Sequence, residues 1–192
     1  MPDGLRGDSP KEVFRIFREH LNGVLHKTIT DFPLVQTITG NRAHLDFRQD
    51  GSGIAVDVGK RYHLYLGQTL QANGSAKDGY ELKTLGYAYR IAEGPSLNDS
   101  WLIRWEYNSR EQGEQQHALH PRNHCHLPSQ LVCFGTRTLS LSKMHISTGW
   151  VTVEEVIRFL IHELKVRPKN TKWDQHLRDS ERLFRKWTAR SV

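Results

Sequence analysis

The sequence predicts an α+β fold, with an N-terminal helix, an antiparallel β-sheet of about six to eight strands and two C-terminal helices packed on that sheet. Three observations support this prediction. Apolar residues recur at helical spacing near both ends of the chain, they alternate with a period of about two in between, and glycine, asparagine and aspartate separate the alternating runs. A length of 192 residues fits one domain, so we expect residues 1–192 to form a single unit with a flexible N-terminus at about 1–8.

The first predicted helix begins at Ser9, whose hydroxyl can accept a hydrogen bond from a free backbone amide. Pro10 suits the first turn of a helix, and Glu12 can reach back to the cap. The apolar residues that follow have the spacing of one helical face: Val13, Phe14, Phe17, Leu21, Val24 and Leu25. We therefore expect this face to pack on the sheet.

The middle of the chain predicts the strands. From Phe32 onward the apolar residues follow a period near two, and Asp50-Gly51-Ser52-Gly53 is typical of a hairpin turn. The candidate strands are 35–39, 43–47, 54–58, 62–66, 80–91 and 101–107. Their aromatic residues share strand faces, where such rings either stack on nucleic-acid bases or form cross-strand pairs in the sheet core.

Two more helices are predicted near the C-terminal end. Thr152 and Glu155 repeat the capping signal, and a helical stripe follows at Val153, Val156, Ile157, Leu160, Ile161 and Leu164. Arg167-Pro168 ends this helix. The last helix is expected at about 171–187, with an inward face made of Trp173, Leu177, Leu183, Phe184 and Trp187.

Charge and composition narrow the possible functions. The chain has 27 lysine and arginine residues against 21 aspartate and glutamate residues, and a net charge of +6 favours a polyanion as partner. No apolar run approaches the roughly 18 residues that cross a bilayer, so we expect no membrane role. The first residues do not resemble a leader peptide, and the two cysteines lack metal-binding spacing. We expect a cytoplasmic protein with reduced cysteines.

Five of the 11 histidines lie between Trp101 and Trp150. In an extended segment His124 and His126 point the same way, while Cys125 points to the other side. Imidazole both exchanges protons near neutral pH and binds metal ions. The pair therefore predicts a functional site of one of two kinds.

The first kind is a metal-independent ribonuclease site, which needs no cofactor. Of His124 and His126, one imidazole would take the proton of a ribose 2′-hydroxyl and the other would protonate the leaving 5′-oxygen, with His120 assisting. Arg104 would offset the negative charge that builds on the phosphate. The residues expected to bind nucleic acid are Arg110, Arg122, Lys143, Trp105 and Tyr107.

The second kind is a zinc or manganese site in a metal-dependent hydrolase. His124 and His126 would need a third ligand, for which His120 and His145 are candidates. The His-x-His pattern among many strands also occurs in cupin-like barrels, but the acidic residue usual a few positions later is missing from Leu127-Pro128-Ser129-Gln130. A third interpretation is that the histidines are exposed polar loop residues without such a role.

Three segments together resemble the TumE-like toxins of bacterial toxin–antitoxin modules. They are Arg104-Trp105-Glu106-Tyr107-Asn108, the histidine-rich stretch that ends at His124-Cys125-His126, and the helix start after Trp150. The resemblance covers about residues 80–165. The family pattern has an aspartate where this chain has Glu106, and its histidine loop is more compact. The resemblance implies a bacterial or phage-related cytoplasmic protein that acts on RNA or is otherwise toxic, with a cognate antitoxin as partner.

These observations together predict a nucleic-acid-directed toxin or defence protein, in the first place a metal-independent ribonuclease. Two alternatives stay open. One is a non-catalytic nucleic-acid-binding module or subunit of a defence complex, and the other is a metal-dependent hydrolase with a His-x-His site. The expected partners are RNA or another nucleic acid, together with an antitoxin or a defence-complex protein.

Overall fold

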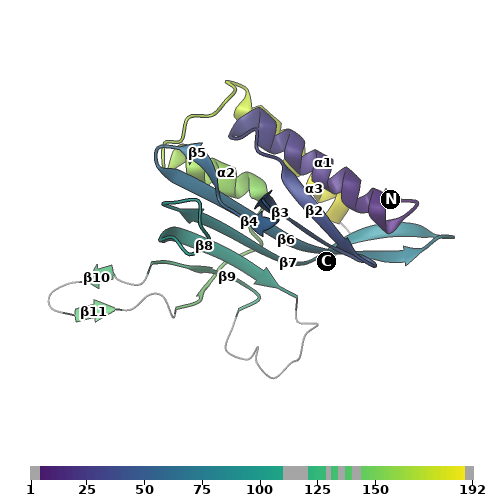
Figure 1. The fold of residues 1–192 in the computed structure, drawn as a ribbon, viewed down its shortest axis with the longest axis horizontal. Helices are drawn as coiled ribbons and strands as arrows, with labels where there is room; N and C mark the ends of the chain where they lie inside the picture. Colours follow the sequence, from purple (N-terminus) through teal and green to yellow (C-terminus); the bar gives the residue numbers. More distant parts are fainter. Residues whose placement is uncertain (1–4, 110–120, 129–130, 134–136, 140–143, 189–192) are drawn as a thin grey trace.

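A computed structural model describes the chain apart from residues 1–4, 110–120, 129–130, 134–136, 140–143 and 189–192. Helix α1 (Pro10–Thr28) precedes most of the strands, and helices α2 (Val153–His162) and α3 (Trp173–Thr188) follow them (Figure 1). This order confirms the predicted α+β fold class. Within the described part of the chain, no helix combines the length and the apolar character that a membrane span requires.

One antiparallel sheet forms the centre of the molecule, with the strand order β12-β9-β8-β7-β6-β3-β2. These strands are β2 (Leu34–Thr39), β3 (Arg42–Gln49), β6 (Tyr62–Ser75), β7 (Gly79–Ala92), β8 (Trp101–Asn108), β9 (Asn123–His126) and β12 (Ile146–Ser147). Strands β6 and β7 form a long hairpin. Gly74 in this hairpin has φ +134°, and a Cβ there would lie 2.1 Å from the carbonyl oxygen of Gly79, so the turn requires glycine.

Short strands extend the sheet beyond the expected size. β1 (Arg6–Gly7) pairs with β7, β4 (Ser52–Gly53) with β3, and β5 (Val56–Gly59) with β6. The sheet therefore has 10 strands rather than six to eight. β5 corresponds to the predicted strand 54–58, whereas β1 and β4, with two residues each, are too short to produce a periodic pattern that a sequence would reveal. β10 (Leu131–Cys133) and β11 (Arg137–Leu139) pair separately from this sheet.

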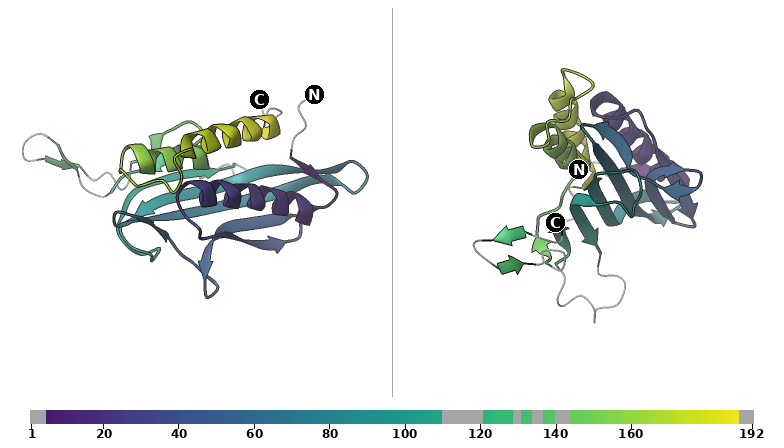
Figure 2. Two further views of the ribbon diagram at one scale, coloured as in Figure 1. Left: turned by 90° about the horizontal axis from the view of Figure 1, so that it is seen from above. Right: turned by 60° about the vertical axis from the view of Figure 1, so that its left-hand side comes forward.

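All three helices lie on the same side of the sheet (Figure 2) and share one apolar core with it. The apolar face predicted for α1 is buried, and Val13 and Phe14 are 0% exposed. The strands contribute alternate residues to this core, among them Leu45, Leu64 and Tyr89. Among the described residues, the opposite face of the sheet carries no helix, so side chains on that face can form a binding surface.

Both predicted N-caps are confirmed, but Glu12 accepts from the N–H of Asp8 rather than from that of the cap residue Ser9. The backbone N–H of Glu12 donates to Oγ of Ser9 at 3.2 Å. Thr152 and Glu155 form a complete capping box, in which the N–H of Thr152 donates to Oε2 of Glu155 at 2.7 Å and the N–H of Glu155 donates to Oγ1 of Thr152 at 3.2 Å. These hydrogen bonds set where α1 and α2 begin.

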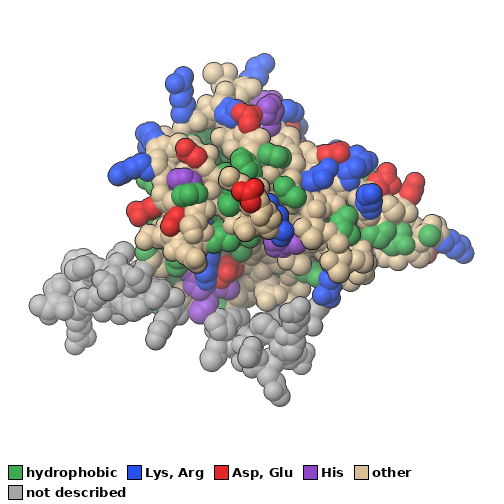
Figure 3. Space-filling model, in the orientation of Figure 1, with side chains coloured by type: hydrophobic (Ala, Val, Ile, Leu, Met, Phe, Trp, Pro, Cys, Tyr) green, Lys and Arg blue, Asp and Glu red, His purple; other side chains and the backbone are tan. Residues whose placement is uncertain are grey.

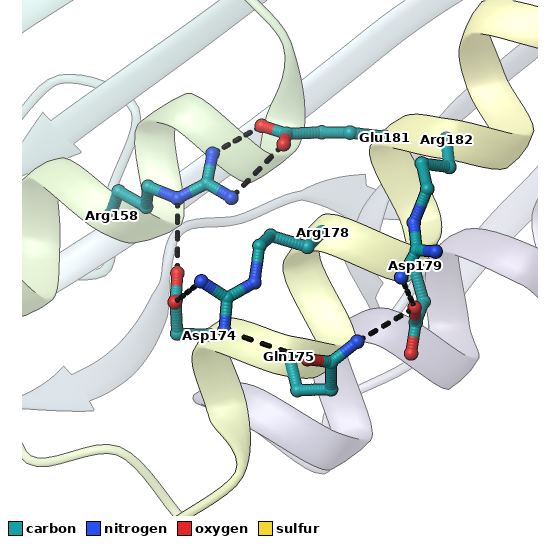
Figure 4. A network of polar contacts seen from close by, with 7 residues as sticks. All are labelled: Arg158, Asp174, Gln175, Arg178, Asp179, Glu181 and Arg182. Atoms are coloured by element: carbon teal, nitrogen blue, oxygen red, sulfur yellow. Dashed lines mark hydrogen bonds and ion pairs between the residues drawn. The ribbon is translucent and has the colours of Figure 1, made fainter.

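Polar contacts also join the helices to one another. In Figure 4, Arg158 of α2 reaches both carboxylate oxygens of Glu181 and, at 3.5 Å, Oδ1 of Asp174, both on α3. Ser180 of α3 donates to the carboxylate of Glu154 on α2, and its Oγ lies 2.8 Å from Nε2 of His20 on α1. The helical layer is therefore tied together by side chains from all three helices.

Candidate functional site

The register of the sheet places Arg104, His124 and His126 on its open face. Glu106 of β8 pairs with His124 of β9, and Arg104 pairs with His126. The row of Glu106 and His124 continues to Ala88 on β7. Because neighbouring strands lie about 4.8 Å apart, paired residues on one face bring their side chains into contact.

Strand β12 brings a third histidine to the same place. Ser147 pairs with His124 and Ile146 with Cys125, so His145 falls opposite His126 at the start of the strand. The ring centroid of His145 lies 4.9 Å from that of His124 and 4.7 Å from that of His126, while the latter two are 4.8 Å apart. His124, His126 and His145 therefore form one compact group, which we call the histidine cluster.

Glu106 contributes a carboxylate to the histidine cluster. Its Oε2 lies 3.0 Å from Nε2 of His126 and 3.5 Å from Nε2 of His124. Nη2 of Arg104 donates to the same oxygen at 3.2 Å. Two imidazoles and a guanidinium thus converge on one carboxylate oxygen.

The hydrogen bonding of His124 determines its tautomer. Nδ1 lies 2.9 Å from the carbonyl oxygen of Pro121, which can only accept, so Nδ1 carries the proton and Nε2 of the neutral ring carries a lone pair. That lone pair faces Oε2 of Glu106, which is also an acceptor. A metal ion held by Nε2 of His124 and this carboxylate would interact favourably with both groups. A backbone carbonyl on the second ring nitrogen is the usual arrangement of a metal-binding histidine.

The spacing of the histidine cluster fits a metal ion. The ligand atoms of His124, His126 and His145 all lie within 4.8 Å of one another. Atoms that bind one ion at about 2.1 Å in a tetrahedron are about 3.4 Å apart, so small side-chain rotations bring the three nitrogens to this distance. Oε2 of Glu106 lies 3.0 Å from Nε2 of His126 and 3.5 Å from Nε2 of His124, which is already close to this separation. Imidazole with carboxylate is a donor set that suits zinc and manganese.

Burial favours the neutral form of His126, which is the form that binds metal. His124 is 9% exposed and His126 is 5% exposed. Burial lowers the pKa of His126, and the positive charge of Arg104 lowers it further, although Glu106 raises it. The neutral imidazole that results has a free lone pair, which metal coordination needs.

The histidine cluster lies at one end of a cleft of about 710 Å³ in the open face of the sheet. Figure 3 shows histidine side chains gathered on the lower side of the molecule, next to the residues that are not described. Three arginines line this cleft, namely Arg42, Arg104 and Arg122. The cleft is therefore suited to an anionic ligand.

Tyr87 positions the strand that carries the first two histidines. Its hydroxyl donates to Oδ1 of Asn123, the first residue of β9, at 3.2 Å and accepts from the N–H of Val151 at 2.9 Å. Burial raises the pKa of Tyr87 to about 12, so the hydroxyl keeps its proton for this contact. The ring also stacks on Tyr89, with centroids 4.5 Å apart. This aromatic pair is part of the core, and Tyr87 also borders the cleft.

The structure brings several predicted residues together and leaves others undecided. His124, His126 and Arg104 lie side by side in the cleft, and Arg122 also lines it. His145, one of the two candidates for a third metal ligand, is in contact range of the pair. The other candidate, His120, lies outside the described residues, as do Arg110 and Lys143.

The structure corrects the role predicted for Trp105. Its ring is 8% exposed and packs against Phe159 of α2, with centroids 5.4 Å apart. It therefore lies on the helix-covered face, where it cannot stack on a nucleic-acid base. Tyr107 packs against Trp150, with ring centroids 4.7 Å apart, and stays half-buried at the border of the cleft.

The carboxylate of the site is the main residue that the sequence did not identify. Cupin-like sequences have their acidic residue a few positions after the His-x-His pair, whereas Glu106 precedes the pair on the neighbouring strand. One signal was present, because Glu106 lies two residues after Arg104 and so shares its strand face. The cleft is also lined by three residues that the sequence did not indicate, namely Arg42, His44 and Tyr65.

No protein-family model, curated protein or solved structure matches the chain. The resemblance to TumE-like toxins therefore stays a prediction.

Proposed function

We propose that the chain is a metal-dependent hydrolase of nucleic-acid phosphodiesters, in which the histidine cluster and Glu106 bind a zinc or manganese ion. One observation carries this proposal: Nε2 of His124 and Nε2 of His126 lie 3.5 and 3.0 Å from the same carboxylate oxygen of Glu106, and the ligand atoms of the three histidines lie within 4.8 Å of one another. Glu106 and His124 would hold a divalent ion, because carboxylate and imidazole both coordinate such ions. The nearby nitrogens of His126 and His145 complete a ligand set that is common at metal sites.

The geometry favours this chemistry over the metal-independent ribonuclease that the sequence suggested first. A general base and a general acid act on opposite sides of the reacting phosphate. His124 and His126 instead converge on one oxygen of Glu106, with ring centroids 4.8 Å apart, which leaves no space for a phosphate between them. The metal-independent reaction is the second candidate, and the observation in its favour is Arg104 paired with His126 at the cluster.

The proposed reaction is the hydrolysis of a phosphodiester bond. A bound divalent ion lowers the pKa of a coordinated water molecule and polarises a phosphoryl oxygen. Water adds to the phosphorus, the bond from phosphorus to the leaving oxygen breaks, and this oxygen takes up the proton that the water releases. Arg104 and Arg122 offset the negative charge that grows on the phosphate oxygens during this step.

Nucleic acid is the substrate class that the charge distribution favours. Three arginines line the cleft, and the whole chain has a net charge of +6. RNA is our first choice of substrate, in keeping with the resemblance to TumE-like toxins. A toxin or defence role in the cytoplasm, with an antitoxin or a defence-complex protein as partner, belongs to the same proposal and rests on that resemblance.

Metal binding by the histidine cluster is the first testable prediction. We expect the purified full chain, stripped with a chelator and then dialysed against zinc or manganese, to retain about one ion per chain in elemental analysis. His145→Ala should weaken the affinity at least about tenfold in calorimetric titration, because it removes a ligand. The matched control is His26→Ala, since the His26 side chain is 72% exposed on α1 and far from the cleft.

Cleavage of a labelled RNA completes this test. Strand breaks should appear with the metal-loaded protein, disappear after chelation and return when the metal is restored. Cleavage that persists unchanged in a metal-free preparation would support the paired-histidine mechanism and contradict the metal site. Tight, salt-sensitive binding without any product would instead identify a non-catalytic binding module.

A further inference from the structure

The cleft continues well beyond the histidine cluster. Its lining runs from His124 and His126 on β9, across β8, β7 and β6, to Arg42 and His44 on β3. These four steps between neighbouring strands amount to about 19 Å at about 4.8 Å a step. Arg42 is therefore too far from the histidine cluster to contact the same phosphate.

The middle of the cleft has a floor with very small side chains. Gly67, Gly86 and Ala88 line it from β6 and β7. The side chain of Tyr65 lies along β6 over Gly67, because a Cβ at Gly67 would come within 2.6 Å of the Tyr65 hydroxyl and 3.0 Å of two ring carbons. The floor thus offers an aromatic ring and bare backbone, against which a planar group such as a nucleobase can lie.

The far end of the cleft has an arginine that can bind an anion. His44 is held between two neighbours, with Nδ1 3.3 Å from Oγ1 of Thr69 and Nε2 3.6 Å from Oδ2 of Asp46. Arg42 beside it is exposed and forms no ion pair with any residue that the structure describes. A guanidinium without a carboxylate partner can bind a phosphate through two parallel hydrogen bonds.

We propose that Arg42 forms a second phosphate subsite beside His44, and that the substrate is a single-stranded polynucleotide lying across the cleft. This inference rests on the proposed function, because the histidine cluster is taken as the place of cleavage. One phosphate lies at the cluster, a base lies on the floor beside Tyr65, and a later phosphate of the same strand reaches Arg42.

Length and volume select this substrate over two others. A single nucleotide is too short to bridge about 19 Å between the two ends of the cleft. A cleft of about 710 Å³ has the size of a small-molecule site, so it fits a few nucleotides of one strand better than a duplex.

Arg42→Gln tests the second subsite, which is our second prediction. Hydrolysis of a hexanucleotide RNA and of a small diester, bis(p-nitrophenyl) phosphate, is measured with the metal-loaded full chain. The variant should raise KM for the hexanucleotide about tenfold, because only the longer substrate reaches Arg42. The KM for the small diester and the amount of bound metal should stay unchanged. Arg185→Gln, the same charge change at an exposed residue of α3, should change none of these values.

The salt dependence of binding provides a second readout. Loss of one phosphate contact to a single strand should make the slope of log affinity against log salt shallower by about 0.7. Arg42→Lys should restore part of the affinity, because it keeps the charge and loses only the paired hydrogen bonds.

Two results would overturn the subsite. One is an unchanged KM for the hexanucleotide in Arg42→Gln, and the other is a wild-type protein that cuts duplex as fast as single strand. If the wild type cuts no RNA with either metal, the proposed function fails instead. Fluorescence anisotropy with a labelled hexanucleotide then decides the subsite separately: weaker binding by Arg42→Gln but not by Arg185→Gln supports it, and equal binding by all three proteins rejects it.

Discussion

Glu154 has an unusual environment for a carboxylate, at the centre of the helical layer. It is 3% exposed, and Ser180 donates a hydrogen bond to it. Burial raises the pKa of Glu154, and the hydrogen bond from Ser180 offsets this only in part. Because the folded-state pKa is raised, the stability that comes from the protonated carboxyl is complete below the ordinary pKa and is lost as the pH rises through the folded-state pKa.

Glu154→Gln should therefore stabilise the protein at neutral pH, which is our third prediction. The amide keeps the acceptor for Ser180 and removes a buried negative charge, and we expect a gain of roughly 1 kcal/mol, or about 2–4 °C in Tm. The difference between variant and wild type should shrink toward pH 4 in thermal melts. A variant that is less stable than wild type at pH 7 would show that the ionised carboxylate is needed in the fold.

At the level of elements, α2 and α3 are joined by a partly buried ion pair. The side chains of Arg158 and Glu181 are 25% and 22% exposed, and Asp174 lies beside them (Figure 4). The pair of Arg182 and Asp179 on the same helix is 68% and 54% exposed. Solvent screens the second pair far more than the first.

Our fourth prediction compares these two pairs. Arg158→Met should destabilise the fold by about 1–2 kcal/mol, because it leaves a partly buried Glu181 without its partner. Arg182→Met should cost less than about 0.5 kcal/mol. Urea denaturation of both variants measures the difference, and equal effects would contradict the role of Arg158 in docking α3 on α2.

The register of β9 is the element-level feature on which the candidate site depends. Cys125 pairs with Trp105 on the helix-covered face, while His124 and His126 occupy the open face. A slip by one residue would exchange these faces and bury both histidines under α2. The core packing of Trp105 and Cys125 therefore also holds the histidine cluster in place.

The whole molecule is a sheet with helices on one face and a cleft on the other. The helices and the sheet share one continuous core, and α1 contacts both α3 and several strands. Layers that share a core do not unfold separately. The folded helical layer therefore supports the register on which the cleft depends.

Cooperative unfolding is our fifth prediction. Far-UV circular dichroism and tryptophan fluorescence should report one coincident thermal transition, because residues of the helices and of the sheet form one core in the described part of the chain. Two separate midpoints would show that the helical layer and the sheet are independent units. In that case a single domain over 1–192 would be contradicted.

The sequence by itself determined the features that depend on near neighbours. Capping residues and helical spacing located α1, α2 and α3, and alternation along a strand showed that His124 and His126 share a face. Arg104 and Glu106 share a face for the same reason. The local backbone sets the relative directions of side chains that are a few positions apart, so the sequence alone predicts which of them share a face.

Only the tertiary structure decided which of these faces meet. Glu106 reaches the two histidines through the register of β8 and β9, His145 joins them through β12, and Arg42 shares their cleft from β3. Pairing between strands depends on the burial of the whole sheet against the helices, which no short segment encodes. The physical reason is that strand alternation is local, whereas register is settled by packing between residues that are distant in the chain.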